Sequence, residues 1–416
     1  MKPVELLAPA GSPECLNAAV GEGADAVYLG LKDFNARLRS ANFAYSQFEG
    51  ALRTLHRMGR RVYVAVNTVF EQREADRMYQ FLQYLSRTGP DGIIVQDLGT
   101  AKMAAECFPA LDIHASTQMN VSSARAANLL SKHKVRRVVL ARELSAAEIT
   151  SVRQNTNVEL ETFVHGALCV SASGLCLFSS YLGGKSANRG MCTQACRRLY
   201  QSDGESSGYY FSLPDLQLLG EVKTLAAAGI NALKIEGRMK SAEYVGAVTA
   251  AYRRVIDALD APDEAYQAAL SDGLRLLKGD FARSKTKYLF YPEASGEKET
   301  VVGHNEPPCT PPDWLCPQQS GGAGIFLGAI TKTRGAGEDF MAAVPRPGMA
   351  AGGETAEMAL EAGDSIRVHS GDDSRRVSHK VKRVYEQGGV LWLSAPEGAA
   401  AGDAVYVIQK KSKNKR

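Results

Sequence analysis

Residues 158–176 read VELETFVHGALCVSASGLC. The first seven, VELETFV, are mostly apolar or β-branched, which is typical of a short buried strand. The strand pattern stops at His165, and a loop that carries Cys169 and Cys176 follows. The fold therefore depends on which sheet contains this strand, and the function depends on what the cysteines hold.

Seven other runs of this kind occur in the first 260 residues, and stretches with helix start signals, such as Ser12 and Ser145, separate them. This alternation is typical of parallel β/α units. Eight units match the size of a (β/α)8 TIM-like barrel of about 250 residues, and a doubly wound open sheet is the alternative. The runs are VELLA (4–8), AVYLGL (26–31), VYVAVN (62–67), GIIVQ (92–96), IHAST (113–117), RVVLA (137–141), VELETFV (158–164) and ALKI (232–235).

Polar residues follow most of these runs. In a barrel the carboxyl ends of the strands meet on one face, where active sites are built. Turns do not require residues such as Gln118, His165 or Arg238, so their positions favour the barrel over the open sheet. We predict substrate contacts from Asn67, Gln118 and Arg142. The full set of strand-end residues is Asn67, Asp97, Gln118, Arg142, Glu143, His165, Glu236 and Arg238.

About 70 residues separate the starts of the seventh and eighth runs, more than one helix needs. The excess is an insertion at about 165–210 that begins on the predicted active face. It holds four cysteines with the spacing C-x6-C-x15-C-x3-C, namely Cys169, Cys176, Cys192 and Cys196. In a reducing compartment such a group more often binds metal than forms disulfides. Structural zinc usually takes two tight pairs, and only the second pair here is tight, so the spacing favours a [4Fe-4S] cluster over zinc.

The composition restricts the class of protein. The net charge is +4 and the pI is about 8.5, which permits an anionic partner such as RNA without requiring one. The N-terminus lacks a charged leader before an apolar run, and no stretch approaches the roughly 18 apolar residues of a membrane span. We therefore expect a cytoplasmic protein without a membrane partner. The sequence contains no HExxH, GxSxG or P-loop motif, so standard hydrolase machinery is absent.

Further residues are candidates for chemistry. Lys185 and Arg189 lie in a glycine-rich loop that either approaches a phosphate or carboxylate closely or is simply solvated. His165 is predicted to act as an acid or base or to hydrogen-bond the cluster, with a structural role as the alternative. Arg238 is suited to clamping an anion, and Glu236 to orienting it or taking a proton, unless the two form a structural ion pair.

The remaining 156 residues do not continue the alternation of strands and helices seen in the first 260. Residues 261–323 are predicted to form a helix and a Pro/Gly-rich connecting segment. Residues 324–416 contain four strand-like pieces and two Gly-Asp turns, at 363–364 and 402–403, which predict a small β-barrel domain with a basic tail at 410–416. The four pieces are GIFLGAI, SIRVH, VLWLSA and AVYVIQ.

The first 260 residues resemble the collagenase-like peptidases of family U32. The family's signature is similar to Glu161-Thr-Phe163-Val-His165-Gly166-Ala-Leu-Cys169 followed by Gly174-Leu-Cys176. The segments LLAPAG, GADAVYLG, LARELS and LKIEGRMK also look like that family.

The resemblance implies an RNA-modifying enzyme, because its better understood members hydroxylate a tRNA uridine or an rRNA cytidine at C5 and are linked to prephenate and iron-sulfur assembly machinery. It implies that the four cysteines hold a [4Fe-4S] cluster, with prephenate as a hydroxyl donor and tRNA or rRNA as a partner. The alternatives are a metal-dependent collagenase-like peptidase, an iron-sulfur protein of the ubiquinone-hydroxylation type, and a non-catalytic partner protein.

Overall fold

A computed structural model describes residues 4–37, 42–201, 207–277, 284–291, 315, 325–345, 360–371 and 375–409. The chain divides into two compact units, whose main segments are Met1–Asp280 and Pro317–Arg416. Most of the predicted connecting segment and the whole basic tail lie outside the described residues, and the predicted domain boundaries remain predictions. None of the described helices is long and apolar enough to cross a membrane.

The first unit is a closed parallel barrel. Strands β1 to β7 pair in sequence order, β9 follows β7, and β9 pairs back with β1. The predicted (β/α)8 barrel is therefore confirmed, and the open sheet is wrong. The barrel strands are β1 Glu5–Ala10, β2 Ala26–Leu29, β3 Arg61–Val66, β4 Gly92–Val95, β5 Ile113–Ala115, β6 Val135–Val139, β7 Glu159–Ala167 and β9 Ala232–Ile235.

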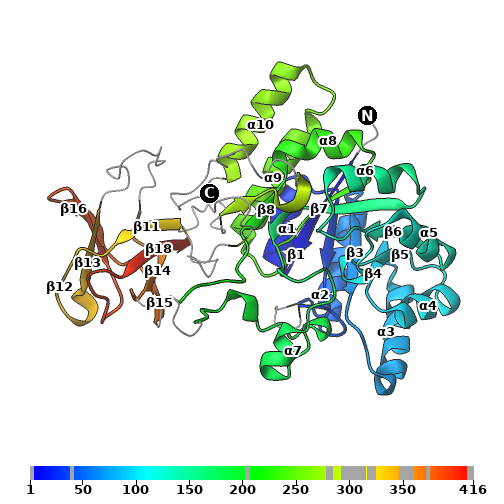
Figure 1. The fold of residues 1–416 in the computed structure, drawn as a ribbon, viewed down its shortest axis with the longest axis horizontal. Coiled ribbons are helices and arrows are strands. Elements are labelled where there is room, and N and C mark those ends of the chain that lie inside the picture. The colour runs from blue at the N-terminus through cyan, green and yellow to red at the C-terminus, as the bar shows by residue number, and fades with distance from the viewer. Residues whose placement is uncertain are drawn as a thin grey trace. The chain divides into compact units, whose positions relative to one another are not determined.

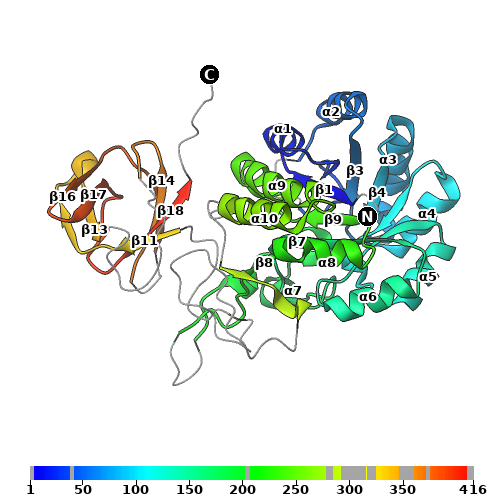
Figure 2. The same cartoon turned by 90° about the horizontal axis from the view of Figure 1, so that it is seen from above.

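Helices surround the strands, as Figure 2 shows from above. Ser12 and Ser145 cap α1 and α6 as predicted, because their side chains accept hydrogen bonds from the amides of Cys15 and Glu148. The helices are α1 Pro13–Gly21, α2 Tyr45–Arg57, α3 Ala75–Thr88, α4 Leu98–Cys107, α5 Ala124–Lys132, α6 Ala146–Gln154, α7 Phe178–Gly183, α8 Val222–Ala227, α9 Ala242–Asp257 and α10 Asp263–Leu277.

The predicted insertion between the seventh and eighth barrel strands has structure of its own. It contains α7, which projects from one end of the barrel in Figure 1. It ends in a short strand, β8 Asp215–Gln217, which pairs antiparallel with β7 and which the sequence did not predict. The two-residue strand β10 Lys285–Thr286 follows β8 at the edge of the sheet. The cysteine segment therefore leaves β7 and returns to it, so both of its ends are fixed to one strand.

Ion pairs fill the inside of the barrel. The Lys234 Nζ lies 2.7 Å from Glu161 Oε1, and Arg137 contacts Glu161 at 3.3 Å and Glu5 at 2.5 Å. All four side chains are almost completely buried. Buried charges need partners, and here two cations face two carboxylates. Arg61 and Glu159 extend this network by pairing with Glu5 and Arg137, so each charge in the barrel interior has an opposite partner.

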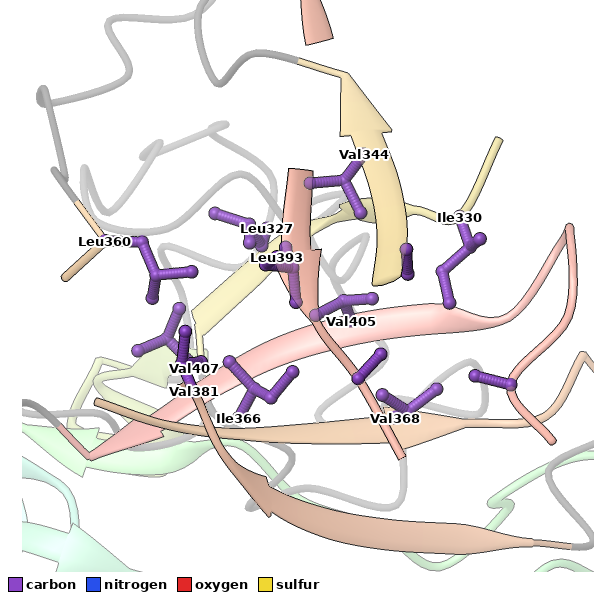
Figure 3. Packing of buried hydrophobic residues seen from close by; sticks show 13 residues of the cluster. Leu327, Ile330, Val344, Leu360, Ile366, Val368, Val381, Leu393, Val405 and Val407 are labelled. Carbon is purple, nitrogen blue, oxygen red and sulfur yellow. The ribbon is translucent and has the colours of Figure 1, made fainter. Parts of the chain in front are cut away.

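The second unit is all-β, as predicted. It contains two four-stranded antiparallel sheets, β11-β18-β14-β15 and β12-β13-β17-β16. Their facing side chains form one apolar core, shown in Figure 3. The strands are β11 Ile325–Ala329, β12 Lys332–Arg334, β13 Met341–Pro345, β14 Ser365–His369, β15 Arg376–Lys380, β16 Val384–Gln387, β17 Val390–Ser394 and β18 Ala404–Gln409.

The two predicted Gly-Asp turns occur just before β14 and β18. Gly363 and Gly402 adopt φ angles of 103° and 94°, which favour glycine. The Asp364 carboxylate accepts a hydrogen bond from the amide of Glu361, and Asp403 accepts one from Ala400 in the same way. The glycine and the aspartate together thus fix each turn and the start of the strand that follows it.

Candidate functional site at the barrel mouth

Four charged residues from three strand ends meet at the carboxyl end of the barrel. Arg37 follows β2, Arg142 follows β6, and Glu236 and Arg238 follow β9. The Glu236 carboxylate lies 3.1 Å from Arg37 Nη2 through one oxygen and 3.3 Å from Arg142 Nη2 through the other. We call these four residues the arginine group. Three guanidinium groups around one carboxylate leave an excess of positive charge.

Burial and the excess of positive charge shift the pKa values of Glu236 and Arg238 in the arginine group. Burial alone would raise the pKa of Glu236, but Arg37, Arg142 and Arg238 outweigh it and lower the pKa to about 2. Burial and the neighbouring Arg37 lower the pKa of Arg238 to about 10. A bound carboxylate or phosphate would relieve the repulsion among the guanidinium groups, so the group is suited to an anionic ligand.

Arg142 is the most constrained member of the group. Its Nη1 donates to the carbonyl of Ala167 at 2.6 Å, and its guanidinium lies 3.9 Å from the centre of the Phe163 ring. Its Nε is buried and has no hydrogen-bond partner among the described residues. A buried donor without a partner is costly, and a ligand oxygen would satisfy it. Arg142, which was predicted to contact the substrate, therefore has one donor, its Nε, that no described residue uses.

Arg238 lies deeper, and small residues make room for it. Its Nη1 contacts Asn35 Oδ1 at 3.4 Å, and a Cβ atom on Gly30 would lie only 2.6 Å from that nitrogen. The predicted strand-end residue Asn67 supports this corner, because its Oδ1 accepts a hydrogen bond from the amide of Ala36 at 3.1 Å. Asn67 thus positions the loop that carries Arg37.

The two residues predicted to transfer protons, Glu236 and His165, have different surroundings. With a pKa of about 2, Glu236 stays ionised at neutral pH, so its geometry fits an orienting role. His165 is buried, with its ring against Tyr244 and Tyr252 of α9, and its Nδ1 lies 3.4 Å from the Tyr252 hydroxyl. This places His165 between the barrel and its helices, in the structural environment that was the alternative.

The cysteine segment packs over the loops that follow β3, β5 and β6. Glu143 binds the hydroxyl of Ser173 at 3.0 Å, and Arg189 pairs with Glu74 at 3.0 Å. Arg189, which was predicted to contact an anionic ligand, is therefore already paired with carboxylates of the protein, whereas Lys185 is exposed. Gln118 lies under the segment, and its buried Oε1 has no partner among the described residues.

Gly174 fixes how closely the segment approaches the barrel. Its φ angle is +76°, and a Cβ atom there would lie 1.9 Å from the carbonyl oxygen of Gln118. Only glycine meets both conditions.

Gly174→Ala is therefore expected to displace the cysteine segment while leaving the barrel folded. We expect at least a tenfold loss of bound iron or zinc, measured by metal analysis of the purified protein, with a far-ultraviolet circular dichroism spectrum like that of the wild type. Gly183→Ala is the control, because a Cβ atom at Gly183 meets nothing within 4 Å and the residue lies in α7. Normal metal content in Gly174→Ala would show that this contact does not position the cysteines.

The four thiols lie close enough to influence one another. Burial raises the pKa of the Cys196 thiol, and the charges of the other three thiolates, those of Cys169, Cys192 and Cys176, raise it further. The Cys192 sulfur accepts a hydrogen bond from the amide of Gln194 at 3.4 Å. Among the described residues, no three His, Cys, Asp or Glu side chains are placed to hold a single metal ion.

Four thiols within range of direct charge interaction are the donor set that a [4Fe-4S] cluster takes. The charge of Cys169 also acts on Arg37, so the cysteines adjoin the arginine group.

Two residues that matter here were not predicted. Arg197 joins both ends of the cysteine segment, because it donates to the carbonyl of Leu168 at 2.8 Å and to the hydroxyl of Ser212 at 2.9 Å. The sequence feature that could have pointed to Arg197 is its position directly after Cys196. Arg37 follows the second strand, where the same strand-end argument that found Arg142 would have pointed to it.

Comparison with known proteins places the chain in a family. Residues 11–300, more than half of the chain, match the model of "Peptidase family U32". The chain is 37% identical over 275 residues to "tRNA hydroxylation protein P1" of Bacillus subtilis, an alignment that covers 63% of this chain and 65% of that protein.

Other relatives carry different names. The chain is 37% identical over 262 residues to a 23S rRNA 5-hydroxycytidine synthase of Escherichia coli, covering 62% of this chain and 40% of the synthase. It is 35% identical over 274 residues to a "Collagenase" of Porphyromonas gingivalis, covering 61% of this chain and 66% of that protein. The chain thus aligns with about two thirds or less of the length of these curated relatives. The family match covers the barrel from α1 onward and the cysteine segment, and the chain belongs to peptidase family U32.

Proposed function

We propose that this protein hydroxylates C5 of a pyrimidine in tRNA or rRNA without molecular oxygen. The observation that carries the proposal is the adjacency of the cysteine segment and the arginine group at the barrel mouth, where Arg142 donates to the carbonyl of Ala167, two residues before Cys169. Relatives named for tRNA hydroxylation and for rRNA 5-hydroxycytidine synthesis support the substrate and the reaction. An RNA substrate of this kind is consistent with the expected cytoplasmic location.

Cys169, Cys176, Cys192 and Cys196 would hold a [4Fe-4S] cluster, which iron-sulfur assembly machinery would have to supply. Such a cluster, when bound, supplies electron-transfer chemistry next to the substrate. The chain's own residues hold the cysteine segment in place: Arg197 ties Leu168 to Ser212, and Gln194 donates an amide hydrogen bond to the Cys192 sulfur.

The arginine group would bind the hydroxyl donor. Replacing C5–H by C5–OH is a two-electron oxidation, so the donor must supply the hydroxyl group and also take up the displaced hydrogen and the two electrons. A carboxylate-bearing donor such as prephenate suits three guanidinium groups with only one carboxylate among them. Arg142 offers its free Nε and Arg238 its buried guanidinium, while Glu236 stays ionised and holds Arg37 and Arg142 in place. The side chains of Arg142 and Glu236 are only 12% and 13% exposed, so bulk water has little access to them.

The test is nucleoside profiling of a strain from which this chain is deleted. We expect one 5-hydroxylated pyrimidine to disappear from total tRNA or rRNA, by mass spectrometry, and to return when the wild-type chain is supplied. An unchanged profile of hydroxylated nucleosides would overturn the proposal. The collagenase-like activity is tested in parallel with purified protein and gelatin, where we expect no cleavage.

A further inference from the structure

The cysteine segment exposes an unusual amount of apolar surface. On and around α7, six large apolar side chains are more than a third exposed, and Tyr181 is 87% exposed and Leu177 68%. We call this the cap surface, and its members are Leu175, Leu177, Tyr181, Leu182, Leu199 and Phe211. Grouped exposed apolar residues, unlike isolated ones, are typical of an interaction site.

The cap surface has a rigid aromatic base. The rings of Phe178 and Tyr200 stack with an interplanar angle of 15°, and Phe211 meets both edge to face at 5.3 and 5.2 Å. The Tyr200 hydroxyl also donates to the carbonyl of Ala195 at 2.9 Å, which connects this base to the cysteine segment. The exposed side chains therefore project from a fixed support.

Within the described residues of the cysteine segment all charged side chains are cations, although Asp203 and Glu205 lie between Leu199 and Phe211 in the sequence. Residues 162–201 contain no Asp or Glu but contain Lys185, Arg189, Arg197 and Arg198. Arg189 and Arg197 are engaged in the contacts described above, whereas Lys185 and Arg198 are exposed and form no ion pair with an acidic side chain among the described residues. Exposed aromatic and apolar side chains interleaved with exposed cations favour a polyanion with flat apolar faces.

We infer that the cap surface binds single-stranded nucleotides of the substrate RNA on either side of the base that enters the barrel mouth. Tyr181 would stack on a base, and Lys185 and Arg198 would contact phosphates. A protein partner is the competing occupant, but the exposed cations Lys185 and Arg198 beside the exposed Tyr181 ring fit the phosphates and bases of RNA better.

The position of the cap surface agrees with this inference. Its loops lie directly over the mouth, because Asn188 accepts a hydrogen bond from the amide of Val69 at 3.2 Å and Gly174 packs on Gln118. A base must leave its stack to reach buried groups such as Arg142 and Arg238, and the flanking nucleotides then need a surface of their own. The inference rests on the proposed function for the identity of the RNA.

The experiment measures binding of fluorescein-labelled bulk tRNA, isolated from the deletion strain, to the purified full-length protein at several KCl concentrations. We expect Tyr181→Ala to bind about 5- to 150-fold more weakly. We expect Lys185→Ala/Arg198→Ala to lower the slope of log K against log [KCl] by about 0.7 for each lost phosphate contact. Leu129→Ala/Lys132→Ala on α5 is the matched control, since both residues are exposed and distant in sequence from the cap surface, and it should bind like the wild type.

Wild-type binding by both cap variants would overturn the inference and assign the surface to a protein partner. That result would leave the proposed function standing if the deletion strain lacks a hydroxylated nucleoside. Conversely, weakened binding by the cap variants together with an unchanged nucleoside profile would support the RNA surface and reject the hydroxylation reaction.

Discussion

Cys176→Ser is expected to abolish both the cluster and the product. Protein purified without oxygen should fall from about four iron and four sulfide per chain to less than a tenth of that, because a [4Fe-4S] cube needs all its thiolates and serine is a poor substitute. The same variant should fail to restore the missing hydroxylated nucleoside in the deletion strain. Iron, acid-labile sulfide and nucleosides are measured on the same cultures.

Cys107→Ser is the matched control for this variant. Cys107 is an exposed free cysteine that ends α4, outside the cysteine segment, whereas Cys176 is half-buried. We expect it to keep the wild-type iron and sulfide content. Zinc in place of iron in the wild-type protein would favour the zinc alternative, and full iron and sulfide in Cys176→Ser would contradict the assignment of the four ligands.

The barrel was predictable because its signals are local. Each strand is a short apolar run, and a polar residue at its end shows which face carries the site, as for Arg142 and Glu236. The cysteine segment was predictable as an excess of length between two strands. The sequence could not show which arginines share Glu236, because that depends on three loops meeting in space.

The direction of the His165 side chain could not be predicted from the local sequence pattern. Side chains of a strand alternate between faces, and Glu161 and Phe163 both contact Lys234 in the barrel interior. His165 should then face inward too. However, the pairing of β7 with β9 shifts register between Phe163 and His165, which turns the histidine toward Tyr252. Sequence alone gives no signal for this irregularity, so the strand-end histidine was assigned to the mouth.

The network inside the barrel explains two of the segments that resemble the family. Glu161 begins the signature and Lys234 lies in LKIEGRMK, and the two meet at 2.7 Å although 73 residues separate them. Their pairing holds β7, which leads into the cysteine segment, against β9, which leads into Glu236 and Arg238. These motif residues therefore act through position, and the proposed ligand contacts come from Arg142 and Arg238.

Arg142→Ala is expected to lower the rate of nucleoside hydroxylation by about 10²-fold or more, the effect typical of removing one buried donor from an anion site. Arg142→Lys keeps the charge but cannot reach the Ala167 carbonyl and Glu236 together, so we expect it to be nearly as impaired. Both variants should keep normal iron and sulfide and should bind prephenate more weakly by calorimetry.

The control for Arg142 lies near the opposite end of β6, the strand that Arg142 follows. Arg136 is an exposed arginine of β6 that pairs with Asp112, and surface pairs contribute only about 0–1 kcal/mol, so Arg136→Ala should keep wild-type hydroxylation. Unchanged prephenate binding in Arg142→Ala would remove the arginine group as the donor site. A loss of iron in the same variant would instead give Arg142 a structural role, because it also connects Ala167, at the start of the cysteine segment, to Glu236.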